Sequence, residues 1–481
     1  MRVKLTTGKE IPLEMYKVRI VQKTSLPPSE ARLRAIEEAG YNTFLLRSRD
    51  VFLDMLTDSG TNAMSDQQLA SMMVSDDAYA GGESFYRLSD AVRDVLGFTY
   101  TVPAHQGRAA EHLLAKILVK KGDVVPMNYH FTTTKAHYEL AGGTVLELYG
   151  PDALETDSRN PFKGNMDIGR LQAAIDKYGA ERISFVRMEA TTNLIGGQPF
   201  SMANLKEVRA LTSKHGIAVV LDGSLISENA HFISKREVGY ERVSVANIVK
   251  EMMAQADILY LSGRKSTCVR GGLIATNERK YYDLLKAWLP VYEGFLTYGG
   301  MSSKEIEAMA VGLREMVDPD VASSSADLIQ YFVESMVARG IPAVTPPGGL
   351  AGHVDAKRFL PHVPQLQYPA GALAAAIYLV SGARPMERGT VSMDRDANGN
   401  DVPSDLELAR LAVPRRVYSM AHMDYVVDRL AWLLEHRELV RGLRFIEEPP
   451  VLRFFTGRMV ALEGWGSALA KAFQADFGME C

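Results

Sequence analysis

Two residues of this chain combine reactive side chains with positions that suit cofactor chemistry. Asp222 directly follows the apolar run 217–221, and Lys265 follows a second apolar run, 258–261. Ligands of parallel α/β sheets bind beyond the carboxyl ends of the strands, so we expect these two side chains to share a site. A lysine there can form a Schiff base, and a carboxylate can pair with a pyridinium nitrogen. The pair therefore indicates an enzyme that uses pyridoxal 5'-phosphate (PLP).

A phosphate site is predicted where a helix begins. Gln106, Gly107 and Arg108 open a stretch whose apolar residues recur with helical spacing. A helix N-terminus offers free N–H groups and the positive end of the helix dipole to an anion, and Arg108 adds charge. Ser262, three residues before Lys265, has a hydroxyl that could reach the same phosphate. Taken alone, a glycine at this position is more often an ordinary helix start.

Strands and helices alternate from about residue 100 onward. The predicted strands cover 145–149, 183–188, 217–221, 258–261 and 273–276, and helices are predicted over 107–118, 202–215 and 245–255. This alternation predicts an α/β fold with a mostly parallel sheet covered on both faces. The short apolar run at 271–274, so soon after Lys265, predicts an antiparallel strand beside it.

Three segments are predicted along the chain. Residues 1–56 form an N-terminal arm, with a helix over 30–39, and part of a small domain. Residues 57–310 form the large PLP-binding domain, and residues 311–481 form the small C-terminal domain. The apolar segment 370–380 is too short to span a membrane, which needs about 20 residues, so we expect a buried helix. The Asp-, Asn- and Gly-rich segment 394–405 predicts a hairpin turn rather than a calcium loop.

The composition is that of an ordinary globular protein. Of the 481 residues, 47% are hydrophobic and 23% are charged, and the net charge is −4. This balance gives no footprint for nucleic acid and no polybasic membrane patch. Two cysteines provide no disulfide framework, and the first residues lack the apolar core of a signal peptide. We therefore expect a cytoplasmic enzyme without nucleic-acid or membrane partners.

Longer motifs resemble one family over nearly the whole chain. They lie at 56–66, 78–81, 105–108, 196–205, 228–232, 293–300 and 452–456. In these segments the chain resembles the β-eliminating lyases, whose two branches act on tyrosine and on tryptophan. The resemblance implies PLP-dependent transferase fold type I, a large domain plus a smaller α/β domain, and a homotetramer with sites completed across a dimer interface.

The same resemblance assigns cofactor roles residue by residue. Lys265 is implied to be the Schiff-base lysine and the base for the α-proton, and Asp222 the partner of the pyridine nitrogen. Phe131 is implied to stack on the cofactor, and Asn193 to donate to its phenolic oxygen. The implied phosphate cradle consists of Gln106, Gly107, Arg108 and Ser262.

Substrate roles follow from the resemblance as well. Arg410, with Ser59 beside it, is implied to bind the α-carboxylate, which suits a bidentate guanidinium. Tyr79 is implied to be the general acid that protonates the leaving ring carbon. Thr132, Arg388 and Phe454 stand where the tyrosine branch differs from the tryptophan branch, and all three favour the tyrosine branch. Phe455 completes the implied substrate site.

The chain also departs from the family pattern. Leu225 stands where an arginine is expected beside the cofactor, and Leu350 where a histidine is expected. Asp77 and Arg270 alter the implied site for a monovalent cation such as K⁺, which would lie near them and near Gly60.

We therefore expect a PLP-dependent carbon–carbon lyase that cleaves L-tyrosine, or a ring-substituted tyrosine, to a phenol, pyruvate and ammonia by β-elimination. A tryptophan indole-lyase, a transaminase or β-substitution enzyme acting on an aromatic amino acid, and a PLP-binding protein without turnover remain as alternatives.

Overall fold

The computed structural model of the protein describes residues 1–478, which divide into two compact units. The boundary between them falls within helix α12 (Pro319–Ala338). The first unit comprises Met1, Ser59–Ala153 and Asn160–Ala326. The second comprises Arg2–Asp58, Leu154–Arg159 and the chain from Asp327 onward.

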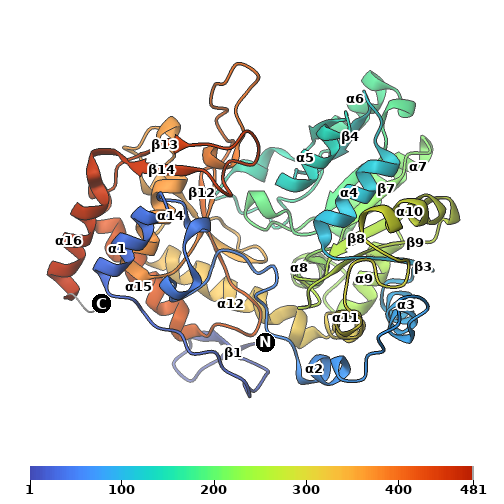
Figure 1. Ribbon diagram of the computed structural model, residues 1–481, viewed down its shortest axis with the longest axis horizontal. Coiled ribbons are helices and arrows are strands. Elements are labelled where there is room, and N and C mark those ends of the chain that lie inside the picture. The colour runs from blue at the N-terminus through green and yellow to red at the C-terminus, as the bar shows by residue number, and fades with distance from the viewer. Residues whose placement is uncertain (479–481) are drawn as a thin grey trace. The chain divides into compact units, whose positions relative to one another are not determined.

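The first unit is built on a seven-stranded sheet with the strand order β3-β9-β8-β7-β6-β4-β5 (Figure 1). Strands β8, β7, β6, β4 and β5 are parallel, whereas β9 runs antiparallel to both of its neighbours. The strands are β3 (Tyr100–Ala104), β4 (Val124–Met127), β5 (Thr144–Glu147), β6 (Val186–Glu189), β7 (Val219–Asp222), β8 (Ile258–Ser262) and β9 (Gly272–Thr276). The predicted mostly parallel sheet and its antiparallel strand after Lys265 are confirmed. Strands β3 and β4 were not among the predicted elements.

Helices cover both faces of this sheet because its strands are apolar on both sides. In β7, Val219 and Leu221 belong to one buried cluster, whereas Val220 belongs to another on the opposite face. The helices of this unit are α2 (Asp66–Met72), α3 (Glu83–Leu96), α4 (Gly107–Leu118), α5 (Thr132–Leu140), α6 (Ile168–Tyr178), α7 (Met202–Lys214), α8 (Ile226–Arg236), α9 (Val245–Met253), α10 (Arg279–Tyr292) and α11 (Ser303–Glu315). The predicted helices over 107–118, 202–215 and 245–255 correspond to α4, α7 and α9.

The second unit surrounds a wholly buried helix, α14 (Pro369–Ser381), as predicted for the apolar segment 370–380. An antiparallel sheet in the order β10-β12-β11 belongs to the same unit. The other elements are β1 (Arg2–Lys4), β2 (Glu10–Pro12), β10 (Ala351–Asp355), β11 (Met386–Arg388), β12 (Leu408–Ala412), β13 (Leu443–Glu447), β14 (Arg458–Ala461), α1 (Ser29–Glu38), α13 (Ala356–Phe359), α15 (Met420–Glu435) and α16 (Trp465–Phe477).

The hairpin predicted over 394–405 needs a correction. A turn is present, closed by the hydrogen bond from Gly399 N to Asp396 O (3.0 Å), but no strand flanks it within the segment. The side chain of Asp396 accepts hydrogen bonds from the backbone of Asn398 and Asn400. These local bonds compete with strand pairing, so the segment is an irregular connection between β11 and β12.

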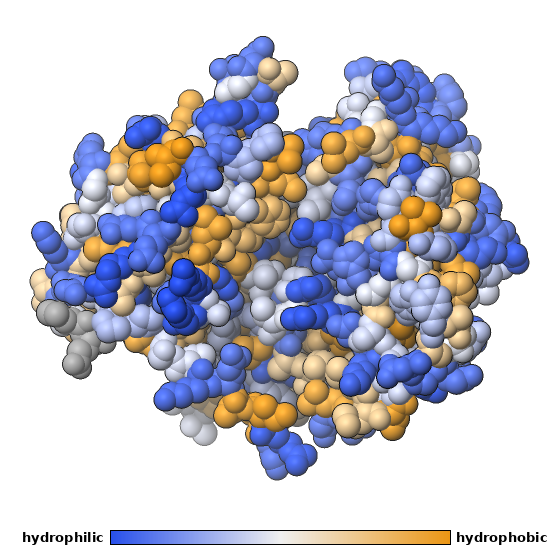
Figure 2. All heavy atoms as spheres, in the orientation of Figure 1, coloured by the Kyte–Doolittle hydropathy of each residue, from blue (hydrophilic) through white to orange (hydrophobic). Residues whose placement is uncertain are grey.

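Over residues 1–478 no helix combines the length and hydropathy required to cross a bilayer. The face drawn in Figure 2 mixes hydrophilic residues with smaller hydrophobic patches.

Candidate active site

Asp222 and Lys265 lie at the same edge of the sheet. Asp222 ends β7, and Lys265 follows the last residue of the parallel neighbour β8 by three positions. The Lys265 Nζ lies 5.1 Å from the centre of the Phe131 ring. Burial raises the pKa of Glu189, the residue paired in register with Asp222, and the charge of Lys265 is close enough to oppose that rise. The structure thus brings together three of the residues predicted for the cofactor site.

Three donors hold the carboxylate of Asp222. Its Oδ2 accepts hydrogen bonds from Arg187 Nη2 (2.6 Å) and from the Tyr260 hydroxyl (2.9 Å), and its Oδ1 accepts one from Ser224 N (3.0 Å). Asp222 is 5% exposed, and Arg187 is fully buried. Three hydrogen bonds therefore fix the orientation of a buried carboxyl group, and such a group can pair with a protonated ring nitrogen.

Two more buried carboxyl groups, those of Glu189 and Glu111, lie near Asp222 and Arg187. Burial raises the pKa of Glu189 to about 7, although the nearby Arg187 opposes the shift. Burial and the charge of Asp222 also raise the pKa of Glu111. None of these residues was predicted from the sequence: Arg187, Glu189, Tyr260 and Glu111. The sequence did contain a signal for two of them, because charged residues are unusual in a buried strand. Arg187 lies within the otherwise apolar strand β6, and Glu189 ends it.

The start of α4 has the features of a phosphate cradle. Gly107 is the first helical residue, and a Cβ there would lie 2.9 Å from the Cβ of Ser262. A Cβ on Gly272 would lie 2.7 Å from the backbone carbon of Gln106. Only glycine permits these two close approaches, and the start of a helix is a place where backbone N–H groups can bind an anion.

Positive charge gathers near this helix start. Burial lowers the pKa of the Arg264 guanidinium, and the charges of Arg270 and Arg108 lower it further. Like charges held this close together are stabilised by an anion placed among them. The residues present therefore fit a phosphate group at one end of the site and a pyridinium nitrogen beside Asp222 at the other.

The remaining predicted residues of the first unit occupy different environments. Asn193 is 2% exposed, and its backbone N–H donates to Glu189 Oε1 (3.1 Å). Thr132 is the first residue of α5, and the carbonyl of the partly buried Ser59 accepts from Arg264 Nη2 (3.5 Å). Tyr79, in contrast, is 74% exposed.

The exposed Tyr79 contacts two partly buried aromatic residues. Its ring centre lies 5.5 Å from that of Tyr298 and 5.8 Å from that of Phe295. The hydrogen bond with Tyr298 raises the pKa of Tyr79, so the phenol keeps its proton well above neutral pH. A protonated phenol is the form that a general acid requires.

The predicted arginines belong to the sheet of the second unit. Arg388 ends β11 and is 2% exposed, and its Nη1 lies 3.4 Å from Ser404 Oγ. Its Nε has no hydrogen-bond partner among residues 1–478. Arg410, in β12, donates to the Leu56 carbonyl (2.9 Å), and burial lowers its pKa to about 10. A buried guanidinium with an unsatisfied donor suits an anionic or phenolic ligand.

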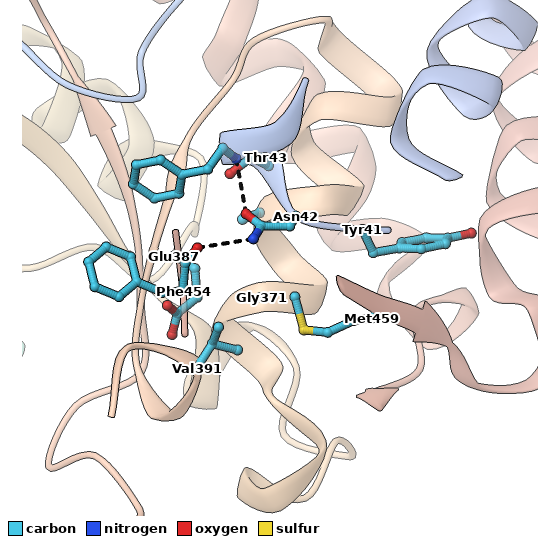
Figure 3. Close-up of a pocket in the computed structure, with 10 residues that line it drawn as sticks. Tyr41, Asn42, Thr43, Gly371, Glu387, Val391, Phe454 and Met459 are labelled. Atoms are coloured by element: carbon cyan, nitrogen blue, oxygen red, sulfur yellow. Dashed lines mark hydrogen bonds between the residues drawn. The ribbon is translucent and has the colours of Figure 1, made fainter. Parts of the chain in front are cut away.

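Phe454 and Phe455 pack against each other with ring centres 4.0 Å apart, and Phe44 contacts both rings. Phe454 also lines a cavity of about 10 Å³, together with Asn42 and Glu387 (Figure 3). This volume holds about one water molecule, so the cavity is too small for an amino-acid substrate.

The sequence profile of the β-eliminating lyases matches residues 54–429. The chain belongs to the β-eliminating lyase family. The resemblance seen in the sequence motifs is thereby confirmed.

Two relatives of this β-eliminating lyase match it over almost its whole length. A tyrosine phenol-lyase from Symbiobacterium sp. (strain SC-1) is 48% identical over 447 residues, covering 92% of this chain and 98% of the relative. A tyrosine phenol-lyase from Pasteurella multocida (strain Pm70) is 46% identical over 450 residues, covering 93% and 98%.

A solved structure of S. paucimobilis serine palmitoyltransferase with a bound PLP–myriocin aldimine is also similar. The TM-score is 0.58 at 14% identity, covering 81% of this chain and 88% of that one. Identity this low concerns the fold alone. The likeness confirms the predicted fold class, PLP-dependent transferase fold type I.

Leu225 and Leu350, which stand where the resemblance implies other residues, are both buried. Leu225 is 2% exposed and precedes the first residue of α8. Leu350 is also 2% exposed and has a positive φ of 77°, a backbone conformation that leucine rarely adopts. Both side chains are therefore parts of the core.

The three residues predicted near a monovalent cation have protein neighbours. Gly60 N donates to Arg264 O (2.9 Å), and a Cβ on Gly60 would lie 2.5 Å from Arg264 Nη2. Asp77 accepts a hydrogen bond from Ser303 Oγ (2.7 Å), and Arg270 is exposed. No group of three or more His, Cys, Asp or Glu within residues 1–478 could hold a metal ion. The cation site stays a prediction.

We expect the stability of the fold to depend on pH through the buried carboxyl group of Glu387, which lies beside the small cavity. Burial, with Glu407 nearby, raises its pKa to about 7 from an ordinary 4.5. Between these pH values the folded state binds more protons than the unfolded state, so the free energy of unfolding falls as the pH rises through this range. We expect Glu387→Gln to be more stable than the wild type at pH 8 by on the order of 3 kcal/mol, and nearly equal to it at pH 4.5.

Denaturant unfolding at the two pH values measures this difference. Glu435→Gln, which alters an exposed carboxylate, is the matched control and should show no such trend. A stability difference between Glu387→Gln and the wild type that does not change with pH would contradict the prediction.

Proposed function

We propose that this β-eliminating lyase converts L-tyrosine and water to phenol, pyruvate and ammonia with bound PLP. The observation that carries the proposal is the position of Lys265 and the buried Asp222 at the carboxyl ends of neighbouring parallel strands, in a chain 48% identical to a tyrosine phenol-lyase. Ring-substituted tyrosines belong to the same proposed substrate class.

The cofactor would be held by residues of the first unit. Asp222 would pair with the ring nitrogen, Lys265 Nζ would hold the cofactor covalently, and Phe131 would pack on its ring. The N-terminus of α4 would bind the phosphate through Gln106, Gly107, Arg108 and the Ser262 hydroxyl, and Asn193 would donate to the phenolic oxygen. When bound, PLP supplies the electron sink that stabilises negative charge at the substrate Cα.

The protein contributes two proton transfers. Lys265 takes the proton from Cα, and Tyr79 donates its phenolic proton to the ring carbon of the substrate that bears the side chain. Thr132 and Arg388 hydrogen-bond the 4-hydroxyl and favour the keto form of the ring. Protonation of the ring carbon then allows the bond between that carbon and Cβ to break, with phenol as the leaving group.

Binding and orientation fall to the other predicted residues. Arg410 pairs with the α-carboxylate, with Ser59 beside it, because a planar guanidinium offers two parallel donors to a carboxylate. Phe454 and Phe455 supply apolar surface for the aromatic ring of the substrate.

We further propose that the enzyme is a homotetramer whose sites are completed by a neighbouring subunit. Exposed apolar side chains that are neighbours in the sequence support this, because contiguous apolar patches mark protein–protein contact sites more often than single apolar residues do. In the N-terminal arm, Ile20 is 78% and Val21 82% exposed; near Tyr79, Met73 is 82% and Val74 71% exposed. Light scattering of the purified protein measures its oligomeric state. The double variant Ile20→Ser with Val21→Ser should weaken the association of subunits.

One observation favours a second candidate function. Leu225 places an apolar, uncharged side chain three residues after Asp222. Removing a cation beside the cofactor would change how the electron sink is tuned, which would suit a β-substitution or a transamination of an aromatic amino acid.

Product analysis separates the candidates. The PLP-loaded protein is incubated with L-tyrosine, and phenol and pyruvate are quantified by chromatography, with L-tryptophan and indole as the parallel assay. Equal amounts of phenol and pyruvate support the proposal. An α-keto acid that keeps its aromatic side chain would indicate transamination, and indole release would indicate the tryptophan branch. Bound PLP with neither phenol nor pyruvate contradicts the proposal.

A further inference from the structure

We infer that Arg187, Tyr260 and Glu111 form a buried positioning cluster that ties Asp222 to the first turn of α5. The inference rests on the proposed function, which gives Asp222, Phe131 and Thr132 their roles. The three side chains come from β6, β8 and α4, and none is more than 4% exposed. Solvent is therefore excluded from every contact within the cluster.

On the Asp222 side, the direction of each hydrogen bond is determined. Arg187 donates from Nε to the Tyr260 hydroxyl (2.9 Å) and from Nη2 to Asp222 Oδ2 (2.6 Å). Because guanidinium has no acceptor, the tyrosine oxygen must accept, and its single proton is left for another partner. The Tyr260 hydroxyl oxygen lies 2.9 Å from Asp222 Oδ2 and 3.4 Å from Glu111 Oε1, so the hydroxyl donates to the nearer Asp222.

On the α5 side, Glu111 holds two consecutive hydroxyl groups. Its Oε2 accepts from Thr133 Oγ1 (2.7 Å), and its Oε1 accepts from Thr134 Oγ1 (2.5 Å). Two adjacent residues bonded to one carboxyl group restrict the rotation of the helix about its own axis. Phe131 and Thr132 immediately precede them, so their orientation depends on this contact.

The charges explain why the two sides act as one unit. The cluster and its neighbour Glu189 comprise three carboxyl groups, counting Asp222, and one guanidinium. Burial disfavours the charged form of such groups and raises the pKa of Glu111 and of Glu189. Asp222 accepts a hydrogen bond from the Arg187 guanidinium, whereas Glu111 accepts only from hydroxyl groups. Removing a hydrogen bond on the Asp222 side is therefore expected to change the charge on Glu111, and removing one on the α5 side is expected to change the surroundings of Asp222.

The test compares dissociation constants for PLP, measured by the absorbance of the bound cofactor. Tyr260→Phe removes only the hydroxyl and is expected to weaken PLP binding about tenfold. Tyr138→Phe is the matched control, because Tyr138 is equally buried in the same unit and its hydroxyl has no partner among residues 1–478. We expect its dissociation constant to stay within about twofold of the wild type. Circular dichroism establishes that each variant is folded.

A double-mutant cycle tests the link between the two sides. If the cluster is one unit, the effects of Tyr260→Phe and Glu111→Gln on PLP binding are not additive. Additive effects would overturn the link, and equal dissociation constants for Tyr260→Phe and Tyr138→Phe would overturn the cluster itself.

A second pair of variants separates positioning from folding. Arg187→Lys keeps one charged donor and should recover part of the PLP affinity lost in Arg187→Met. Equal losses in both folded variants would contradict the positioning role. These binding measurements need no turnover. A wild-type protein that binds PLP but releases no phenol would therefore refute the proposed function, whereas the PLP dissociation constants of the variants would still decide whether the cluster positions Asp222.

Discussion

Lys265→Ala is expected to lower phenol release from L-tyrosine by on the order of 10⁴-fold, because the variant lacks both the amine that holds the cofactor and the base that removes the Cα proton. Initial rates of phenol formation, measured with PLP in excess, give the size of the loss. The residual affinity for PLP should remain measurable, since Asp222 and the start of α4 are untouched.

Lys235→Ala is the control for this variant. Lys235 lies on α8 in the same unit and is exposed, so its loss should leave the rate of phenol formation unchanged. Turnover in Lys265→Ala close to that of Lys235→Ala would remove Lys265 from the mechanism.

Tyr79→Phe should abolish the cleavage of tyrosine while preserving chemistry at Cα. We expect phenol release to fall by roughly 10²- to 10⁴-fold, the usual contribution of a positioned general acid. Exchange of the substrate α-proton with solvent, followed by NMR in deuterated buffer, should continue, because Lys265 performs that step. The two rates measured on one sample separate the two proton transfers.

A substrate with a better leaving group sharpens the test of Tyr79. β-Chloro-L-alanine loses chloride, which needs no proton, so pyruvate formation from it should change little in Tyr79→Phe. Tyr86→Phe, which alters a neighbouring half-exposed tyrosine, is the matched variant and should leave both substrates unaffected. A parallel loss with tyrosine and β-chloro-L-alanine would mean that Tyr79 supports the site in another way and is not the acid.

The exposure of Tyr79 gives this prediction a structural consequence. A side chain that is 74% exposed within one chain is poorly placed to exclude water by itself. If the tetramer forms as proposed, dilution or Ile20→Ser with Val21→Ser should reduce phenol release together with the fraction of tetramer. Activity that persists in a monomer would contradict the completion of the site by a neighbour.

Several features followed from the sequence alone. Apolar runs that end in Asp222 and Lys265 were sufficient to predict parallel strands and a shared edge, because strand periodicity and strand ends are local properties of a chain. The wholly buried helix α14 followed from its continuous apolar composition. The family followed from ordered motifs, and the matching profile over residues 54–429 confirmed it.

Other features were decided only by the tertiary structure. The bonds that hold Asp222 join residues 35 and 38 positions apart, and the contact between Tyr260 and Glu111 spans 149 positions. No periodicity encodes such pairings, since each depends on how strands and helices stack. The same holds for the segment 394–405, where side chains bonded to the backbone displaced the predicted strands. Local sequence patterns determined which elements form and where the reactive residues stand on them, whereas the packing of distant elements decided which buried charges meet.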